Sequence, residues 1–221
     1  MRSLFHTLVY DTNLLNPEEA LFQDLQKESL QIRSFDEEGQ EWSADNYPGG
    51  FTSYASRNDL FYMSSTFREL EEKIRPCAYD FAEALGYDID GLELTISDMW
   101  VNIMGPGCVH TGHIHPLSFI SGTYYVCMPK GASAIRFEDP RLGLQMACPP
   151  RRMAVEDSLL SFVSHQPAAG DLVLFESWLR HEVPPHSSEE ERVSVSFNYH
   201  WSHSNEACGG KGYGTGDQGE E

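Results

Sequence analysis

The chain has 221 residues, of which 40% are hydrophobic and 12% aromatic, a composition typical of a folded globular protein and not of a disordered one. Its 15 basic and 34 acidic residues give a formal net charge of -19, and a surface this acidic argues against nucleic acid as the main partner. No apolar run approaches the ~20 residues of a membrane-spanning helix, and the N-terminus lacks the apolar core of a secretory signal peptide.

The five cysteines are odd in number, and no two of them have C-x-x-C spacing. This pattern disfavours a disulfide framework or a zinc ribbon and indicates reduced thiols. We therefore expect a cytoplasmic protein. We expect one domain over residues 1–204, with a helical and loop-rich part over 1–91 and a β-rich part over 92–204. Residues 205–221 form a glycine-rich acidic tail that we expect to be flexible.

The first third of the chain predicts two helices and a loop between them. Residues 17–34 begin with a proline and two glutamates and carry leucine and isoleucine near one face, which predicts a helix. Residues 36–54 contain three glycines and a proline and predict a long loop. A serine–threonine run and apolar residues at helical spacing predict a second helix over residues 64–85, ended by Gly86.

From about residue 92 the pattern changes to short β-prone runs separated by turn signals such as Pro129-Lys130-Gly131. Short strands with regular punctuation predict an all-β sandwich or barrel. The runs cover residues 94–103, 119–128, 134–138, 159–164, 171–176 and 192–201.

Three histidines form a candidate metal site. His113 and His115 would project from one face of a strand, with Ile114 on the other face. His181 follows the apolar run 172–175 and a turn, and can supply a third imidazole from another strand. Three imidazoles leave coordination positions open, and imidazole suits Fe, Zn, Ni and Cu alike. An isolated H-x-H can equally be a polar pair at the end of a strand.

A polar stripe begins eleven residues after His181. On a strand, Arg192, Ser194, Ser196 and Asn198 share one face, while the apolar residues between them share the other. The stripe could face solvent. It could also line the interior of an open barrel, where an arginine recognises a carboxylate through two parallel hydrogen bonds.

In this order, H-x-H, a distant histidine and an arginine about ten residues later resemble the Fe(II)- and 2-oxoglutarate-dependent dioxygenases. The chain is more closely similar to a group of 2-oxoglutarate oxygenases of bacteria and phages. The resemblance covers roughly residues 92–201 and implies a mainly β fold of the α+β type. This fold is a double-stranded β-helix (a cupin-like jelly roll), with the N-terminal helices packed on its larger, outer sheet. The resembling segments are residues 113–116, 121–126, 137–141, 170–175, His181 and residues 192–198.

The resemblance also implies roles for individual residues. The Fe(II) ligands would be His113, His115 and His181. The residues that bind or surround 2-oxoglutarate would be Arg192, Ser194, Tyr125, Asn102, Ser196 and Asn198. Arg192 would pair with the distal carboxylate, Ser194 would add a hydrogen bond, and Tyr125 sits where related prolyl hydroxylases place a cosubstrate-binding tyrosine. The implied reaction is oxidative decarboxylation of 2-oxoglutarate by O₂ to succinate and CO₂, coupled to hydroxylation of a second substrate.

One departure leaves alternatives open. Most of the superfamily has a carboxylate ligand where this chain has His115, so three neutral imidazoles would leave the iron with one more positive charge. Asp98 or Asp139 could supply a carboxylate, but the sequence does not place either at the metal. One alternative is a three-histidine, cupin-like dioxygenase that does not use 2-oxoglutarate, and another is a non-catalytic metal-binding module.

Further residues near these motifs allow weaker expectations. His110 is expected at the surface, and His200 is expected to point out of the barrel mouth. Trp178 could wall the pocket or belong to the core. Of the adjacent Tyr124 and Tyr125, only one can face the site, because side chains alternate along a strand.

The substrate, whether a small molecule or a protein, does not follow from the sequence. Residues 36–54 and 149–160 are candidate lids, because loops around a rigid barrel usually set specificity. We expect neither a nucleic acid nor a membrane as partner, and a homodimer is the commonest assembly for such a protein.

Overall fold

The computed structural model describes residues 4–141, 143, 146–152 and 154–204, so the tail predicted to be flexible lies outside the described residues. The helices are α1 (Ala20–Phe35), α2 (Glu37–Asn46), α3 (Leu60–Met63) and α4 (Ser65–Ala84). The strands are β1 (Val9–Asn13), β2 (Gly50–Thr52), β3 (Leu92–Met104), β4 (His110–His113), β5 (Ile120–Cys127), β6 (Ile135–Glu138), β7 (Phe162–His165), β8 (Asp171–Glu176), β9 (His181–Val183) and β10 (Arg192–His203).

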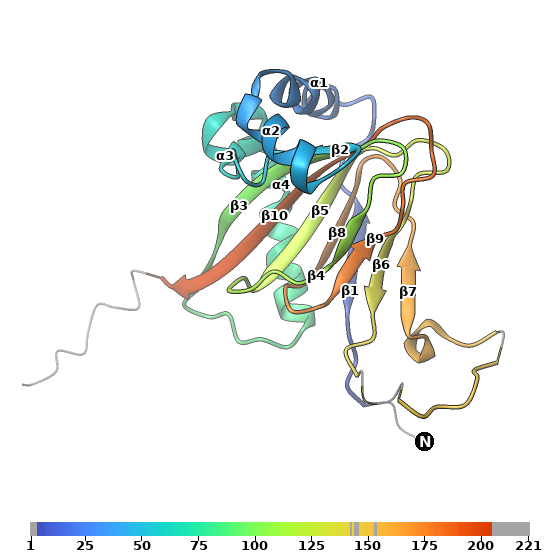
Figure 1. The fold of residues 1–221 in the computed structure, drawn as a ribbon. Coiled ribbons are helices and arrows are strands. Elements are labelled where there is room, and N and C mark those ends of the chain that lie inside the picture. Colours follow the sequence, from blue (N-terminus) through green and yellow to red (C-terminus); the bar gives the residue numbers. More distant parts are fainter. Residues whose placement is uncertain (1–3, 142, 144–145, 153, 205–221) are drawn as a thin grey trace, which may run out of the picture.

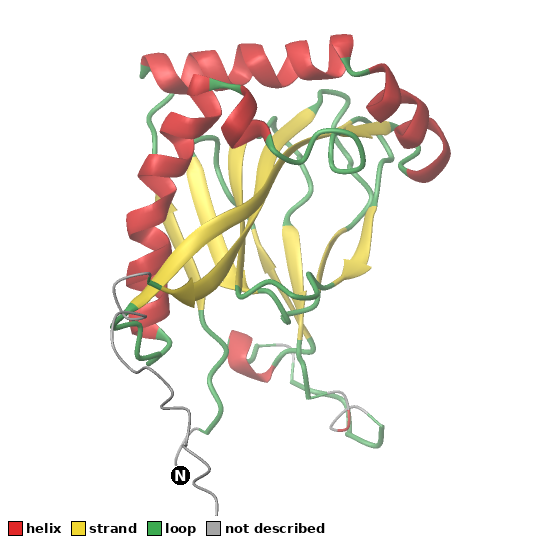
Figure 2. Ribbon diagram, turned by 90° about the vertical axis from the view of Figure 1, so that its left-hand side faces the viewer, coloured by secondary structure: helices red, strands yellow, loops and turns green. Residues whose placement is uncertain are grey.

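The strands form two antiparallel sheets that face each other (Figure 1). The larger sheet has the order β1-β8-β5-β10-β3-β2, and the smaller has the order β4-β9-β6-β7. The predicted jelly roll is therefore confirmed. The helices flank the strands on one side and at one end (Figure 2).

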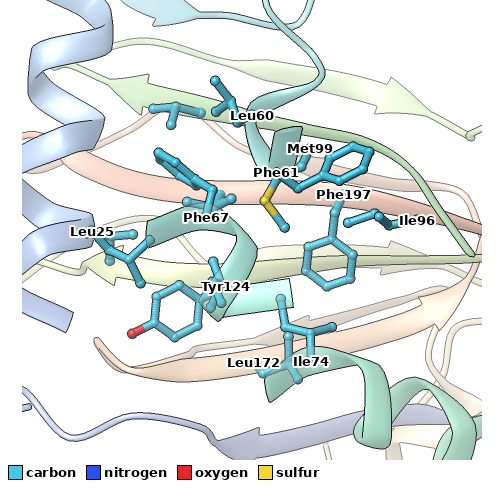
Figure 3. Packing of buried hydrophobic residues seen from close by; sticks show 14 of the residues in the cluster. Leu25, Leu60, Phe61, Phe67, Ile74, Ile96, Met99, Tyr124, Leu172 and Phe197 are labelled. Carbon is cyan, nitrogen blue, oxygen red and sulfur yellow. The ribbon is translucent and has the colours of Figure 1, made fainter. Parts of the chain in front are cut away.

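The main hydrophobic core lies between the helices and the larger sheet (Figure 3). Alternate residues of β10, from Val193 to Tyr199, point into this core. From α4, Phe67, Leu70 and Ile74 meet them and are fully buried. Each such side chain contributes roughly 1.5–3 kcal/mol through burial. The remaining β10 residues point between the two sheets, so the predicted polar stripe faces the interior of the jelly roll and not the solvent.

A β-bulge in β3 changes which residues of that strand face the core. Asn198 pairs with Asp98 and Tyr199 pairs with Ile96, so Ser97 is an extra residue between two regular stretches. Before the bulge the even-numbered residues point into the core, whereas after it the odd-numbered residues from Met99 onwards do so. An extra residue shifts side chains to the opposite faces. The bulge therefore turns Asp98 toward the space between the sheets.

The structure confirms the two predicted helices as α1 and α4, but the loop predicted for residues 36–54 is wrong. It contains α2, and it also contains β2 at the edge of the larger sheet. The Asp36 side chain accepts a hydrogen bond from the Gly39 N–H, and Glu37 and Glu38 occupy the first turn of α2. A cap and acidic residues at a helix start stabilise the helix enough to accommodate Gly39.

The β-prone runs were located correctly, and the strands expected to carry His113 and His181 are β4 and β9, but β1 and β2 were not predicted. The run predicted to start at residue 159 starts at Phe162, because Asp157–Leu159 forms a short 3-10 helix. The division into parts 1–91 and 92–204 stays a prediction, and β1 and β2 of the first part pair with strands of the second. Over the described ranges, no helix has the length and apolar character needed to cross a membrane. The cytoplasmic location and the homodimer also stay predictions.

Candidate metal centre

The three histidines predicted as metal ligands lie together at the open end of the space between the sheets. His113 ends β4 and pairs directly with His181, the first residue of β9. His115 lies two residues beyond the end of β4, and not on a strand as predicted, but it still faces the other two while Ile114 points outward. Each histidine offers a ring nitrogen, and these atoms lie within 4.8 Å of one another. Among the described residues, these three are the group able to share one ion.

Hydrogen bonds orient each of the three imidazole rings. The Nδ1 atom of His113 lies 2.7 Å from the Thr111 carbonyl oxygen, and that of His181 lies 2.9 Å from the Leu179 carbonyl oxygen. The Nδ1 atom of His115 lies 2.6 Å from the Asn198 side-chain oxygen. An Nδ1–H that donates to oxygen leaves the Nε2 lone pair for a metal, and ligating histidines are commonly held in this way.

Burial keeps these imidazoles neutral, the state in which they can bind a metal. Burial lowers the pKa of His181 to about 2, helped by the neighbouring His113. It also lowers the pKa of His113, and that of His115, where the bond to Asn198 acts in the opposite direction. The three residues therefore fit a divalent metal ion in both geometry and protonation.

Asn198 connects His115 to a carboxylate farther out. Its side-chain NH₂ donates to Asp98 Oδ2 at 3.3 Å, while its oxygen accepts from His115. The Ser121 hydroxyl donates to the same oxygen at 2.8 Å. Because a carboxylate can only accept, these bonds determine which way the Asn198 amide points. Asp98 thus reaches the metal ligands only through Asn198.

Arg192 lies in the interior with no anionic partner. Its side chain is 3% exposed, and none of the ion pairs among the described residues involves it. Nη1 contacts only two neutral acceptors, Met104 Sδ at 3.4 Å and Ser194 Oγ at 3.3 Å, and Nε has no partner. A buried charge without a counter-charge is costly, so this position favours an anionic ligand.

The other predicted cosubstrate residues surround Arg192 to different degrees. The Arg192 guanidinium lies 5.1 Å above the centre of the Tyr125 ring, and the Tyr125 hydroxyl is buried with no hydrogen-bond partner. Burial raises the pKa of Tyr125 to about 12, against the effect of the Arg192 charge. Asn102 donates to Ser196 Oγ at 3.1 Å, and its own oxygen is unpartnered. These orphaned atoms offer further donors and acceptors to a ligand.

A narrow inner pocket connects the histidines with Arg192. It is lined by all three candidate ligands and by Asn102, Arg192, Ser194 and Ser196, whereas Tyr125 and Asn198 lie outside its lining. Its volume is about 30 Å³, room for two or three waters at ~10–15 Å³ each. A dicarboxylate can therefore enter only if side chains around this pocket move apart.

A much larger outer cavity of about 580 Å³ opens on the other side of the histidines. Trp100, His110, His113 and His115 line both spaces, so a molecule in the outer cavity lies next to the candidate metal ligands. Residues of the candidate lid 36–54 line it, among them Trp42 and Tyr54. From the other candidate lid, residues 157–160 line a separate cavity beside β6 and β7.

Several weaker expectations are corrected by the structure. His110 is not a surface residue, because its ring stacks on His113 with 4.6 Å between centres and lines both spaces. Trp178 is 46% exposed and lines neither space, so it belongs neither to the pocket wall nor to the core. Asp139 forms an ion pair with Arg141, away from the histidines.

His200 lines the outer cavity and is not part of the metal-ligand group. Of the two adjacent tyrosines, Tyr124 belongs to the core on the helix side of the sheet, and Tyr125 faces the interior. The inner pocket is also lined by Trp100, Thr123 and Glu182, which were not predicted. Trp100 and Thr123 lie on β3 and β5, the strands on either side of the polar stripe, and Glu182 follows His181 on β9; these positions are the sequence signal that could have indicated them.

Several solved structures share this fold. The chain is similar to a Pseudomonas putida prolyl-4-hydroxylase, with 16% identity, a TM-score of 0.56, and coverage of 87% of this chain and 92% of that one. It is similar to the epimerase SnoN from nogalamycin biosynthesis, with 14% identity, a TM-score of 0.60, and coverage of 90% and 81%. It is also similar to HygX from Streptomyces hygroscopicus, solved with nickel, 2-oxoglutarate and hygromycin B, with 13% identity, a TM-score of 0.58, and coverage of 90% and 84%.

These identities are low, and the likenesses establish the fold alone. No curated protein sequence matches the chain. A family model described as "Putative 2OG-Fe(II) oxygenase" matches residues 98–198, which run from Asp98 on β3 to Asn198 on β10. This segment contains all three candidate ligands and Arg192. Through this β-helix segment, residues 98–198, the chain is similar to the 2OG-Fe(II) oxygenase family.

Proposed function

We propose that the protein is a non-haem dioxygenase that uses Fe(II), 2-oxoglutarate and O₂ to hydroxylate a second, organic substrate. His113, His115 and His181 hold the metal, and Arg192 with Ser194 binds the distal carboxylate of 2-oxoglutarate. The buried Arg192 without an anionic partner is the single observation that carries this proposal. It favours an anionic cosubstrate over a metal site that works without one.

The strands position these groups for their roles. The imidazoles come from the paired strands β4 and β9 and from the turn after β4, so the backbone register determines their separation. Arg192 and Ser194 lie on one face of β10, and Ser194 is hydrogen-bonded to Nη1 of Arg192. An anion that replaces this weak bond satisfies a guanidinium that is already desolvated and oriented. Little rotamer entropy is then lost on binding.

His115 takes the position at which most relatives have a carboxylate. Its Nδ1–H is held by Asn198 and lies 3.0 Å from the Ser121 hydroxyl, so the ring enters the site in one orientation. A hydrogen bond from Nδ1 to an amide oxygen raises the basicity of Nε2. This compensates in part for the absence of a charged ligand.

The chemistry divides between the bound groups and the chain. When bound, Fe(II) and 2-oxoglutarate supply the activation of O₂ that no side chain can perform. The chain holds the metal, orients the cosubstrate through Arg192 and presents the second substrate from the outer cavity. Trp100 and the stacked His110 lie between the inner pocket and the outer cavity and restrict the access of water.

Anaerobic titration tests the proposal. Fe(II) alone should bind with an affinity that is lost in the His113→Ala and His181→Ala variants. Subsequent addition of 2-oxoglutarate should produce a visible charge-transfer band that requires both components. Iron binding without such a band would instead favour a three-histidine dioxygenase that does not use 2-oxoglutarate, or a non-catalytic metal module. Failure to bind any divalent ion would refute all three.

A further inference from the structure

The outer cavity is lined mainly by aromatic and neutral side chains, although the protein carries a net charge of -19. Among the described residues that line it, Asp98 is the only one with a carboxylate, and none is a lysine or an arginine. Its aromatic lining residues are Trp42, Tyr47, Tyr54 and Trp100. At about 580 Å³ it has the volume of a site for a ligand of drug-like size.

The Asp98 carboxylate is available to a cation. It accepts neutral hydrogen bonds from the Asn58 side-chain NH₂ at 3.1 Å, from the Ser97 hydroxyl at 2.7 Å and from Asn198 at 3.3 Å. These donors hold the carboxylate in place without neutralising its charge. None of the ion pairs among residues 4–204, so far as they are described, includes Asp98.

Aromatic rings stand beside this carboxylate. The rings of Tyr54 and Trp100 meet edge-to-face with 4.9 Å between their centres, so together they form a corner of the cavity. The faces of such rings attract cations, and tryptophan does so most strongly. A carboxylate next to a corner of aromatic rings is the arrangement that suits a protonated amine attached to carbon.

The mouth of the cavity is apolar. Leu117 is 94% exposed and has a positive φ of 69°, a strained conformation for a leucine, and it lines the opening together with Ile114 and Pro116. Aliphatic side chains held outward at an entrance suit the apolar part of a ligand. In addition, the net charge of -19 attracts cations toward the molecule and repels anions.

We propose that the outer cavity binds a substrate that carries a protonated amine next to apolar carbons, with Asp98 as its ionic partner and Tyr54 and Trp100 as its aromatic contacts. This inference rests on the proposed function in treating the cavity as the substrate site. Asp98 is then a residue that determines specificity. The amine can belong to a small molecule or to a lysine side chain, since both offer the same cation.

The test uses charge-matched probes on the full-length protein. One set is phenethylamine, its N-acetyl derivative and 3-phenylpropionate. The second set is a capped tripeptide with a central lysine and the same peptide with that lysine acetylated. Dissociation constants come from tryptophan fluorescence and from ligand-observed NMR. We expect the amine of at least one set to bind about tenfold more tightly than its neutral partner, as one charge-assisted hydrogen bond would give. The set that shows the preference identifies the source of the cation.

Three variants locate the effect. Asp98→Asn should abolish the preference for the amine, whereas Glu93→Gln, which changes the net charge equally on the exposed part of the same strand, should preserve it. Tyr54→Leu leaves the hydrogen bonds of Asp98 intact and should weaken amine binding about threefold. It therefore keeps the proposal testable if Asp98→Asn fails to fold.

The inference is overturned if neither amine binds more tightly than its neutral partner, if Asp98→Asn retains the preference, or if Glu93→Gln removes it as well. The probes require neither iron nor 2-oxoglutarate. An amine preference in a protein that binds no 2-oxoglutarate would refute the proposed cosubstrate while supporting the cation site. Binding of 2-oxoglutarate without an amine preference would do the reverse.

Discussion

Replacement of Arg192 by methionine should change stability and cosubstrate binding in opposite directions. In the absence of ligand, Arg192 is 3% exposed and its guanidinium contacts neutral atoms at 3.3–3.4 Å. Methionine has a similar length and carries no charge. Replacing a buried ion pair by apolar side chains is often neutral or stabilises by about 1–4 kcal/mol, and a lone buried charge lacks even the attraction of a partner. We therefore expect Arg192→Met to raise the melting temperature of the ligand-free protein by several degrees, at ~2–4 °C per kcal/mol for a chain of this size.

Cosubstrate binding should move the other way. At a 2-oxoglutarate concentration of about 100 Kd, the native protein gains roughly 2.7 kcal/mol. Loss of two charge-assisted hydrogen bonds, at ~1.5–3 kcal/mol each, weakens binding a hundredfold or more. The gain in Arg192→Met then falls below about 0.5 kcal/mol. Thermal denaturation with Zn(II) in place of iron, with and without 2-oxoglutarate, measures both effects.

The control is Arg33→Met, because Arg33 forms an exposed ion pair with Glu191. Such a pair contributes roughly 0–1 kcal/mol, so this variant should be slightly less stable and should respond normally to 2-oxoglutarate. The reasoning is refuted if Arg192→Met is strongly destabilised without ligand and its response to 2-oxoglutarate is unchanged. In that case the arginine would serve the fold and not the cosubstrate.

Three further outcomes follow from the site and the core. Asn198→Ala should lower metal affinity 10–100-fold, measured by competition with a chelator, because it frees the His115 ring. Asn58→Ala also removes a hydrogen bond to Asp98 but leaves His115 held, so it should not lower metal affinity. The pKa of His181 is lower in the folded than in the unfolded protein, so the unfolded state takes up protons first. The free energy of unfolding of the metal-free protein should therefore fall between pH 6.5 and 5.5, by about 1 kcal/mol from His181 and further from His113 and His115, whose pKa values are also lowered. A flat urea-denaturation profile over this range would contradict the assignment. Gly122→Ala should lower the free energy of unfolding by about 1–3 kcal/mol in the same assay, because the added carbon would lie 2.5 Å from a ring carbon of Phe197 in the core. Unchanged stability would show that the core side chains move to accommodate the methyl group.

The parts of the site that could be predicted are those encoded by local periodicity. Alternation along a strand places the polar residues of β10 on one face, and Arg192 among them suggests an anion. The spacing of apolar residues in α4 likewise follows the helical period. In both cases the pattern depends only on neighbours in the chain.

What could not be predicted depends on contacts between distant segments. The direct pairing of His113 with His181 is a property of register between β4 and β9, which are separate in sequence. His110 lies inside because Tyr47 packs against its ring, with 5.4 Å between centres. Tyr47 follows α2, a helix that was not predicted because Gly39 suggested a loop. The walls of the outer cavity that come from this segment were therefore not predicted either.

The extra residue at Ser97 divides β3 into two stretches with different structural roles. Residues 98–104 pair with β10 and, at their far end, with β2, and they present side chains to the histidines and the outer cavity. Residues 92–96 pair with β10 alone and turn Leu94 and Ile96 toward α4. Deletion of Ser97 would restore regular pairing between β3 and β10. Residues 92–96 pair with fewer strands, so their side chains would be the ones to change faces of the sheet.

Leu94 and Ile96 would then leave the core, whereas the residues of β3 that face the metal ligands would keep their positions. Accordingly, residues 92–96 can be redesigned to repack against α4 without altering the site. Of the second stretch, only Asp98, Trp100 and Asn102, which face away from the core, can be redesigned to alter the site without disturbing the helices. A single inserted residue makes the scaffold and the binding surface of one continuous strand separately adjustable.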